Sequence, residues 1–240
     1  GEELINSIPR YCLWLEYINP DELKKLKEVS KRIKQVYQVR SSSSRDATRK
    51  LAQYASLFGE MRQPTEDFIA LPRVSSENRK YIPITILPKE IIAGDKVYTI
   101  SGGSIFNFGI LISTMHMSWM RVTSGRLKSD YSYSTLLTYN NFPWPENINE
   151  KQVKTIEEKA QQVLDTRLIF TDSSLADLYD PLTMPPALVK AHNELDKAVD
   201  LAYRSQPFTS EAKRMEFLFE LYEKYTADLF TKEKLKKTKK

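Results

Sequence analysis

Cysteine and long apolar runs are nearly missing from this sequence. Its 240 residues include one cysteine, Cys12, so no disulfide can form within the chain. No apolar run approaches the roughly 20 residues that a bilayer-spanning helix needs. The opening residues, GEELINSIPR, contain no basic region followed by an apolar segment, and a secretory signal has both. We therefore expect a globular protein of the reducing cytoplasm with no membrane partner.

The motifs of several enzyme classes are also absent. The sequence contains no P-loop, GxGxxG, HExxH, CxxC or GxSxG pattern. The stretch YNNFP at 139–143 differs from the amide-Pro-Pro-aromatic signature of amino-group DNA methyltransferases, because Asn and Phe stand where the prolines belong. His116 and His192 have no second metal-type ligand at helical spacing, which favours a core or surface role. Catalysis is not expected within these residues.

The formal net charge of +5 is unevenly distributed. Residues 1–64 carry +4, residues 65–145 carry +2, residues 146–231 carry −6, and the tail 232–240 carries +5. The tail KEKLKKTKK is typical of a solvated segment or of nonspecific contact with a polyanion. Total charge alone is therefore weak support for a nucleic-acid partner.

Helical patterns frame the sequence at both ends. Asn19-Pro20 reads as an N-cap followed by proline at the first helical position, and apolar residues then recur every three or four positions up to Arg40. A second, weaker helical stripe runs from Ala47 to Phe58. Three further stripes lie at 153–163, 188–202 and 215–229, and three helices with one apolar face each could bury those faces against one another.

The middle of the chain is richer in β-branched and aromatic residues and is broken by proline and glycine. We expect strands at 68–74, 80–87, 96–100 and 105–111, and a short helix at 113–123. The fold class expected is therefore α+β. The expected domains are a helical entry segment at 1–64, a β-rich recognition domain at 65–145, a C-terminal helical domain at 146–231 and the basic tail at 232–240.

The segment GRLKSDYSYS, Gly125 to Ser134, alternates polar groups in an unusual way. In an extended chain Lys128, Asp130 and Ser132 share one face, and Ser129, Tyr131 and Tyr133 share the other. A solvent-exposed edge strand would explain this pattern. Base recognition would also explain it, because lysine donates to guanine and aspartate accepts from the cytosine amino group in the major groove. Arg126 would then be free to bind a phosphate.

Several longer segments carry a resemblance to a known family. RVSSENRKYIPI at 73–84, MHMSWMR at 115–121, GRLKSDYSYS and YNNFPWP at 139–145 resemble the target-recognition part of MmeI-like, type IIL DNA methyltransferases. LADLYDPLTMPPALVKAHNELDKAVDLAY and FTSEAKRMEFLFELYEKY resemble the helical domain that closes these proteins. The resemblance covers nearly the whole chain in matching order.

The resemblance implies a set of base-reading positions. In this family the alternate residues after GRL resemble a readout code, and here they are Lys128, Asp130 and Ser132. Many relatives carry arginine where this chain has Ser132, so their base preference at that contact does not transfer. The family pairs this last position with one about thirty residues upstream, which corresponds to Lys96.

Other polar residues have the chemistry expected for phosphate contacts, although a turn built from Ser and Asn explains several of them equally well. These residues are Arg73, Ser75, Ser76, Arg79 and Lys80. Phe142 and Trp144 are interpreted as core anchors at the junction of the domains.

The function implied is sequence-specific recognition of double-stranded DNA by part of a larger bacterial restriction-modification protein. The parent would be an adenine-N6 DNA methyltransferase that uses S-adenosylmethionine and flips its target base, with an endonuclease as a further expected part. The partners would be double-stranded DNA and the methyltransferase domain of the same parent chain.

Two alternatives remain open at this point. A protein-interaction module would use the C-terminal helices to brace or recruit a partner subunit. An independent nuclease would need clustered acids, for which the nearest candidates are Asp172, Asp177 and Asp180.

Overall fold

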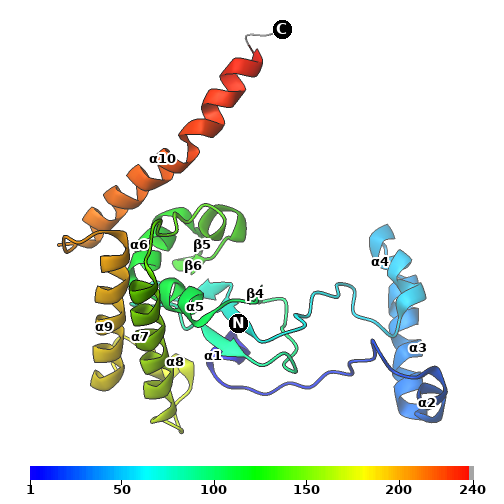
Figure 1. The fold of residues 1–240 in the computed structure, drawn as a ribbon. Helices are drawn as coiled ribbons and strands as arrows, with labels where there is room; N and C mark the ends of the chain where they lie inside the picture. The colour runs from blue at the N-terminus through cyan, green and yellow to red at the C-terminus, as the bar shows by residue number, and fades with distance from the viewer. Residues whose placement is uncertain (238–240) are drawn as a thin grey trace. The chain divides into compact units, whose positions relative to one another are not determined.

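The computed structural model describes the backbone of residues 1–237 and the side chains of residues 1–227. It contains two compact units, one formed by Gly1–Ile8 with Pro64–Lys240 and the other by Pro9–Gln63. The larger unit holds both the β-rich segment and the C-terminal helices (Figure 1). The α+β fold class is confirmed, whereas the four domain boundaries stay a prediction.

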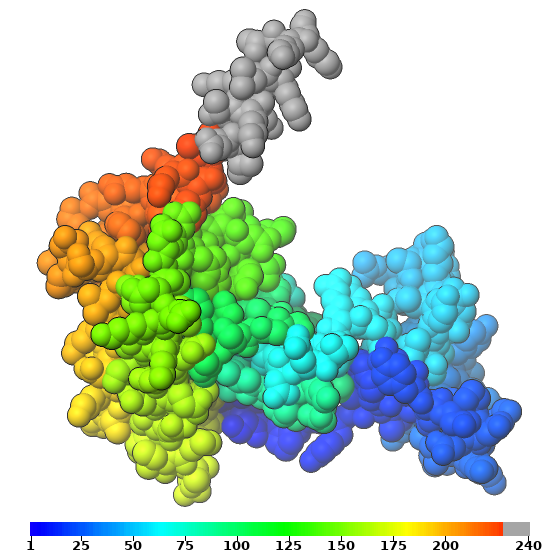
Figure 2. Space-filling view, in the orientation of Figure 1, coloured from blue at the N-terminus to red at the C-terminus, as the bar shows by residue number. Residues whose placement is uncertain are grey.

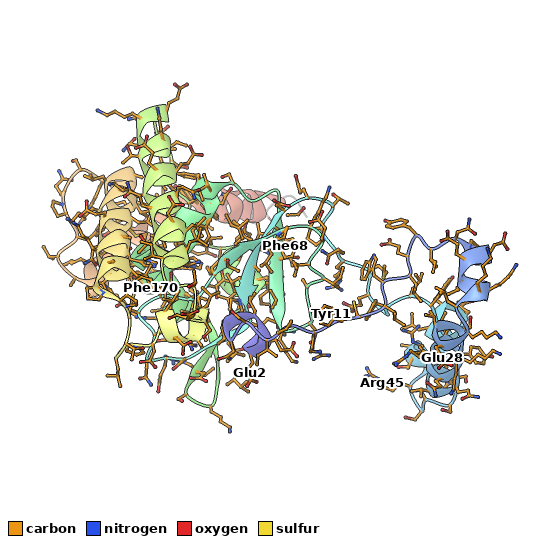
Figure 3. All side chains as sticks on the ribbon, turned by 90° about the horizontal axis from the view of Figure 1, so that it is seen from below. Glu2, Tyr11, Glu28, Arg45, Phe68 and Phe170 are labelled. Atoms are coloured by element: carbon orange, nitrogen blue, oxygen red, sulfur yellow. The ribbon has the colours of Figure 1, made fainter. Side chains whose placement is uncertain are left out.

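Short helices make up the smaller unit, in which Glu28 and Arg45 are labelled in Figure 3. They are α2 (Pro20–Lys25), α3 (Lys27–Ser41), α4 (Asp46–Lys50) and a 3-10 turn (Leu51–Tyr54). The expected start is confirmed, because the Asn19 side chain accepts a hydrogen bond from the Asp21 amide at 2.8 Å. The expected single helix to Arg40 is interrupted at Leu26, whose ψ of 78° is not helical.

One arginine holds this unit together. The Arg40 guanidinium, at the end of α3, donates hydrogen bonds of 2.8–3.1 Å to the carbonyl oxygens of Leu51, Tyr54 and Leu57. These carbonyls belong to the segment that follows α4, so the planar guanidinium of one arginine joins the end of α3 to that segment.

The larger unit begins with α1 (Glu2–Ile5) and contains two small antiparallel sheets. The first has the order β3 (Thr85–Leu87), β1 (Phe68–Pro72), β4 (Val97–Ser101). The second has the order β2 (Val74–Ser75), β6 (Asp130–Ser132), β5 (Gly125–Leu127). The expected strand at 68–74 is therefore divided at Arg73 between two sheets, and the one at 80–87 is extended only at its end.

The expected strand at 105–111 is wrong, because these residues form helix α5 (Ile105–Leu111). The Ser104 hydroxyl accepts from the Asn107 amide, and the Asn107 side chain accepts from the Ser104 amide. This reciprocal cap satisfies donors that would otherwise be unpaired at a helix start. The apolar run looked like a buried strand because its last residues are buried all round.

Helix α6 (Thr114–Thr123) confirms the short helix expected at 113–123. Its Trp119 is buried and donates to the Thr138 carbonyl at 2.9 Å, and its ring meets Phe142 edge-on. Phe142 is 4% exposed and Trp144 packs against the same core, so both act as the core anchors expected.

The C-terminal helices complete the larger unit. They are α7 (Glu150–Leu168), α8 (Leu175–Leu178), α9 (Pro186–Tyr203) and α10 (Glu211–Lys237). Helices α7 and α9 run side by side and cover α5 (Figure 1). Figure 2 shows the α7 segment directly against the green segment that contains α5 and α6. The residues of the expected α9 stripe are all buried, because that face meets α5, α6 and α7.

Helix α10 packs mainly on α6 rather than closing a three-helix bundle with α7 and α9. Phe219 and Tyr222 face the Trp119 ring, with centroids 5.4 and 5.7 Å away. The backbone of α10 continues into the expected basic tail, 232–240, as far as Lys237. Residues 238–240 and the side chains from 228 onward, including that of Leu229, lie outside the described part. In the described part, no helix is both long and apolar enough to cross a membrane.

Candidate functional site

The GRLKSDYSYS segment forms a hairpin. Strands β5 and β6 pair in antiparallel register, with Leu127 opposite Asp130, so Lys128 and Ser129 make a two-residue turn. Tyr131 is 7% exposed, whereas Asp130 and Ser132 are half-buried. The expected alternation is therefore confirmed within β6.

Lys128 differs from the expected strand geometry. It is exposed and lies in the turn with φ of 57°, a left-handed conformation that non-glycine residues seldom adopt. Because the turn interrupts the two-residue period of the strand, its side chain does not follow the alternation of Asp130 and Ser132. The three candidate base-reading residues still belong to one hairpin.

A buried histidine connects the end of the hairpin to the helical core through hydrogen bonds. His116 of α6 donates from Nδ1 to the Leu111 carbonyl at 2.9 Å, which leaves Nε2 to accept from the Tyr133 hydroxyl at 2.9 Å. Burial lowers the pKa of His116 to about 4, so the ring is neutral at pH 7. This confirms His116 as a core residue, and it links the helical core to the residue after Ser132.

Arg126 is engaged inside the hairpin. Its guanidinium donates to the Ser129 carbonyl at 2.7 Å, pairs with the Glu77 carboxylate at 3.4 Å and lies 3.9 Å from the centroid of the Tyr131 ring. The Glu77 amide also donates to an Asp130 carboxylate oxygen at 3.4 Å. Glu77 therefore connects the loop after β2 to both strands of the hairpin.

Sequence reasoning did not find Glu77. It lies about fifty positions from its partners in the chain, and no local pattern marks such a pair. Only its acidic charge in a segment of basic and hydroxyl residues, RVSSENRK, offered a signal.

Lys96 comes close to the hairpin through Arg73. The Arg73 amide donates to the Lys96 carbonyl at 3.0 Å, and the Arg73 carbonyl accepts from the Tyr133 amide at 2.8 Å. The Lys96 ammonium pairs with Asp95 at 3.1 Å and stays 69% exposed. The upstream position that the family resemblance implies thus lies one backbone strand away from the end of β6.

Arg73 itself is exposed. Its guanidinium donates to the Asp95 carbonyl at 3.1 Å and lies 5.1 Å from the centroid of the Tyr98 ring. It therefore rests on the surface beside Lys96.

The remaining candidates are Ser75, at the end of β2, and three residues of the loop that follows it, and they differ in exposure. Ser75 is 6% exposed and pairs with Tyr131 in the sheet, while the Ser76 hydroxyl accepts from the Asn78 amide at 3.3 Å, as a turn would have it. Burial lowers the pKa of Arg79, and its Nε has no protein partner. Lys80 is exposed and donates to Asn193 at 3.3 Å.

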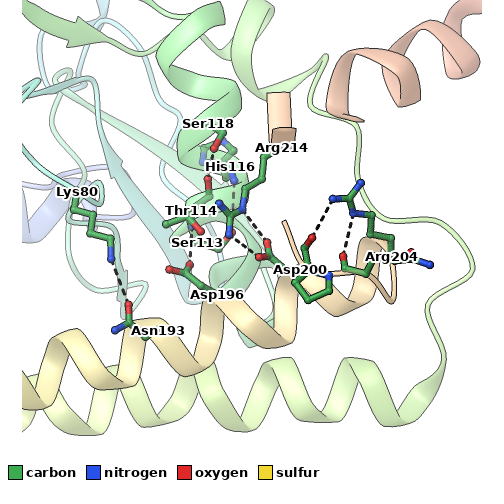
Figure 4. Close-up of polar contacts among 12 residues, drawn as sticks. Lys80, Ser113, Thr114, His116, Ser118, Asn193, Asp196, Asp200, Arg204 and Arg214 are labelled. Atoms are coloured by element: carbon green, nitrogen blue, oxygen red, sulfur yellow. Dashed lines mark hydrogen bonds and ion pairs between the residues drawn. The ribbon is translucent and has the colours of Figure 1, made fainter. Parts of the chain in front are cut away.

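A buried polar network fixes the base of this loop to the helices (Figure 4). The Asp196 carboxylate of α9 accepts from the Tyr81 hydroxyl and from the Thr114 amide, both at 2.7 Å. Burial raises the pKa of Asp196. Nearby, Arg214 of α10 forms a two-point ion pair with Asp200 of α9 at 2.6 and 3.0 Å. Helix α9 thus anchors the end of the loop through Tyr81 and the start of α6 through Thr114.

His192 of α9 is also a core residue. It is fully buried. Its Nε2 atom forms a hydrogen bond of 2.7 Å with the Tyr179 hydroxyl, and its ring stacks on the Tyr81 ring with the centroids 4.0 Å apart. Arg167 of α7 donates to the same Tyr179 hydroxyl at 2.9 Å.

Two of the three acidic residues considered for a nuclease, Asp177 and Asp180, have local structural roles. Asp177 accepts from the Ser174 amide at 2.9 Å and caps α8, and Asp180 accepts from the Leu182 amide at 2.8 Å. Among the described residues, no group of three or more His, Cys, Asp or Glu side chains is placed to hold a metal ion.

Two family models together match almost the entire chain. The model described as "MmeI, target recognition domain" matches residues 1–146, and the one described as "MmeI, C-terminal domain" matches residues 148–230.

Individual relatives agree with these models. DNA methyltransferase A of Bacillus subtilis (strain 168) is 40% identical over 224 residues, which are 93% of this chain and 25% of that protein. A solved structure of the type IIL restriction-modification enzyme MmeI in complex with DNA superposes with a TM-score of 0.90 at 44% identity, over 94% of this chain and 30% of that one. The chain thus spans a quarter to a third of the length of these relatives. It belongs to the MmeI family of type IIL restriction-modification DNA methyltransferases, of which it carries the target recognition domain and the C-terminal domain.

Proposed function

We propose that this chain binds double-stranded DNA and selects the site on which a larger adenine-N6 DNA methyltransferase acts. The observation that carries the proposal is the β5–β6 hairpin. Tyr131 is buried in the core, whereas Asp130 and Ser132 of the same strand keep part of their surface exposed and Lys128 is exposed in the turn. Strand β6 lies between β2 and β5 in a small sheet. The similar solved structure is that of an enzyme in complex with DNA.

The hairpin supplies the base-reading groups in this proposal. Lys128 donates to guanine O6 and N7 and Asp130 accepts from the cytosine amino group, which together would read one G·C pair. Ser132 and Lys96 serve a neighbouring contact, since the Arg73 backbone joins their two segments. The Glu77 amide already takes one Asp130 oxygen, so the other oxygen is left to accept from a base.

Phosphate contacts would hold the duplex in register without reading sequence. Arg73 and Lys80 are exposed, whereas Arg79 is half-buried and its unpartnered Nε is enclosed by the protein. To bind a phosphate, Arg126 would either keep its hydrogen bond to the Ser129 carbonyl or exchange it for one to the phosphate. Ser75 and Ser76 would contribute phosphate contacts where β2 meets the loop that follows it.

The parent protein would supply the chemistry. We propose S-adenosylmethionine as its cofactor, bound in a methyltransferase domain that precedes this region in the same chain and is its intramolecular partner. An endonuclease in the same parent is part of the proposal. The proposal assigns no step of methyl transfer to the residues of this chain. A site-selecting part of such an enzyme would work in the bacterial cytoplasm, where the DNA is.

Exchange of two residues tests the base-reading assignment. The double variant K128D/D130K of the full-length enzyme should methylate a site that differs from the wild-type site at one base pair, because donor and acceptor have changed places. One good base contact is worth about 1–3 kcal/mol of discrimination. The measurement is sequencing-based detection of methylated adenines.

A matched control separates charge from position. The exchange E194K/K197E reverses an exposed ion pair on α9 and should leave the methylated site unchanged. An unaltered site in K128D/D130K would show that the hairpin does not read that base pair.

The alternative of a protein-interaction module makes a different prediction. Its binding would be insensitive to salt and would use the C-terminal helices, so variants in the hairpin would leave it intact. DNA binding that weakens steeply with salt supports the DNA-recognition proposal instead.

A further inference from the structure

The smaller unit, residues 9–63, has a strong excess of positive charge. It contains twelve Lys and Arg residues against six Asp and Glu residues, a net charge of +6. The base-reading and phosphate-binding candidates discussed above all lie in the larger unit. The surplus charge of the smaller unit therefore has no role in the function proposed so far.

Helix α3 carries three lysines in addition to Arg32 and Arg40. Lys27, Lys31 and Lys34 are spaced by four and three residues, so they share a face of the helix, and we call them the lysine stripe. All three are exposed and none forms an ion pair within the described part of the chain. Two other lysines of the unit are neutralised, since Lys24 pairs with Asp21 and Lys50 with Asp46.

Lys27 and Lys31 lie apart from the side of α3 that packs, whereas Lys34 also lines a groove with Ile33 and Ala52. Val29, Ile33 and Arg40 are among the half-buried positions of the helix, and Arg40 fixes it to the turn after α4. The helix is therefore held by one side, and the three lysine side chains remain exposed.

A solvated helix face is the ordinary explanation for exposed lysines, but it accounts poorly for this stripe. Like charges four residues apart destabilise a helix by a few tenths of a kcal/mol, and ordinary exposed helices relieve this with acidic partners. Helix α3 contains a single acidic residue, Glu28, which no ion pair connects to the stripe in the described structure. Uncompensated charge at this spacing indicates a ligand that carries the opposite charge.

The dimensions of the stripe match duplex DNA. Seven residues of α-helix rise about 10 Å, and each DNA strand carries one phosphate about every 3.4 Å along the axis. Flexible lysine side chains bind phosphates as point charges without fixed geometry. A stripe of this length can therefore face more than one phosphate of a backbone.

We propose that Lys27, Lys31 and Lys34 bind the phosphate backbone of double-stranded DNA, as a contact of the smaller unit that is separate from the base-reading hairpin. The contact contributes affinity but no sequence preference. This inference rests on the proposed function, because it requires that the full protein bind duplex DNA.

The test measures how affinity depends on salt. The triple variant K27Q/K31Q/K34Q of the full-length enzyme should bind DNA with a shallower slope of log K against log salt, by about 0.9 for each phosphate that the variant no longer neutralises. Its methylated site should stay that of the wild type. The variant K27R/K31R/K34R, which keeps the charge, should keep the wild-type slope.

The control is K197Q/K213Q/K224Q, which removes the same charge from lysines that are paired with Glu194, Glu216 and Glu146 on or beside the acidic helices. It should bind with the wild-type slope. Circular dichroism should show unchanged helix content in the K27Q/K31Q/K34Q variant, since its side chains are exposed.

The experiment distinguishes a failure of the inference about the lysine stripe from a failure of the proposed function. A wild-type slope for K27Q/K31Q/K34Q, or an altered methylated site, overturns the inference about the stripe alone. A wild-type enzyme that binds duplex DNA without any site preference overturns the proposed function instead.

Discussion

At the scale of single residues, the hairpin depends on groups that never face the proposed ligand. The Tyr133 hydroxyl is held by a neutral imidazole, and Glu77 holds Arg126 and Asp130 together. A side chain that reads a base is useful only when its position is fixed by such neighbours. The His116–Tyr133 contact is buried, so its contribution to stability is measurable apart from DNA binding.

His116 predicts a pH dependence of stability. Its folded pKa is about 4, below the ordinary value of 6.5, because burial opposes the charge. The unfolded chain takes up the proton first, so the free energy of unfolding should fall as pH drops from 6.5 towards 4. The full contribution is about 3 kcal/mol. Urea denaturation at several pH values measures it.

The variant His116→Asn isolates this effect. The buried His192 also has a lowered pKa and contributes in the same direction in both proteins, so the difference between the two pH profiles belongs to His116. Parallel profiles for wild type and variant would contradict the prediction.

At the scale of elements, α5 and α7 approach closely beneath the sheets. Gly109 faces α7, and a Cβ atom there would lie 3.0 Å from side-chain carbons of both Ile156 and Ala160. Both neighbours are fully buried and have no room to move. A glycine that is unfavourable for helix propensity is thus needed for this packing.

The substitution Gly109→Ala should destabilise the larger unit. Forcing a methyl group into a packed core costs about 1–3 kcal/mol, and the better helix propensity of alanine returns up to about 1 kcal/mol. Gly94→Ala is the control, because no atom lies within 4 Å of a Cβ built there. Urea denaturation should show a lower midpoint for Gly109→Ala only; equal midpoints would refute the packing argument.

At the scale of the whole molecule, the two units differ sharply in how much they bury. Ala52 is the one buried residue among 9–63 in the structure, whereas the core of the larger unit joins strands, hairpin and C-terminal helices. Little buried apolar surface leaves little free energy to oppose chain entropy.

Hydrogen exchange should therefore separate the units. Amides of α3 are expected to exchange through local opening at a much lower free energy than those of α7 and α9. Native-state exchange read by mass spectrometry would measure both in one sample. Protection of α3 equal to that of α9 would show that the smaller unit is more stable than its burial implies.

The sequence by itself determined what short-range patterns encode: the α+β class, the Asn19 cap, the buried faces of α7 and α9, and the alternation of Asp130 and Ser132 against the tyrosines. Its longer motifs also identified the family. These features depend on residues a few positions apart, so periodicity and capping chemistry are enough to predict them.

Only the tertiary structure decided the rest. Burial on all sides hid the helical nature of 105–111, the turn removed Lys128 from the strand, and the packing of α10 on α6 replaced the expected bundle. Glu77 met its partners across about fifty positions. Contacts of this kind depend on how whole elements pack, and no local pattern in the chain records which distant residue will fill a given place.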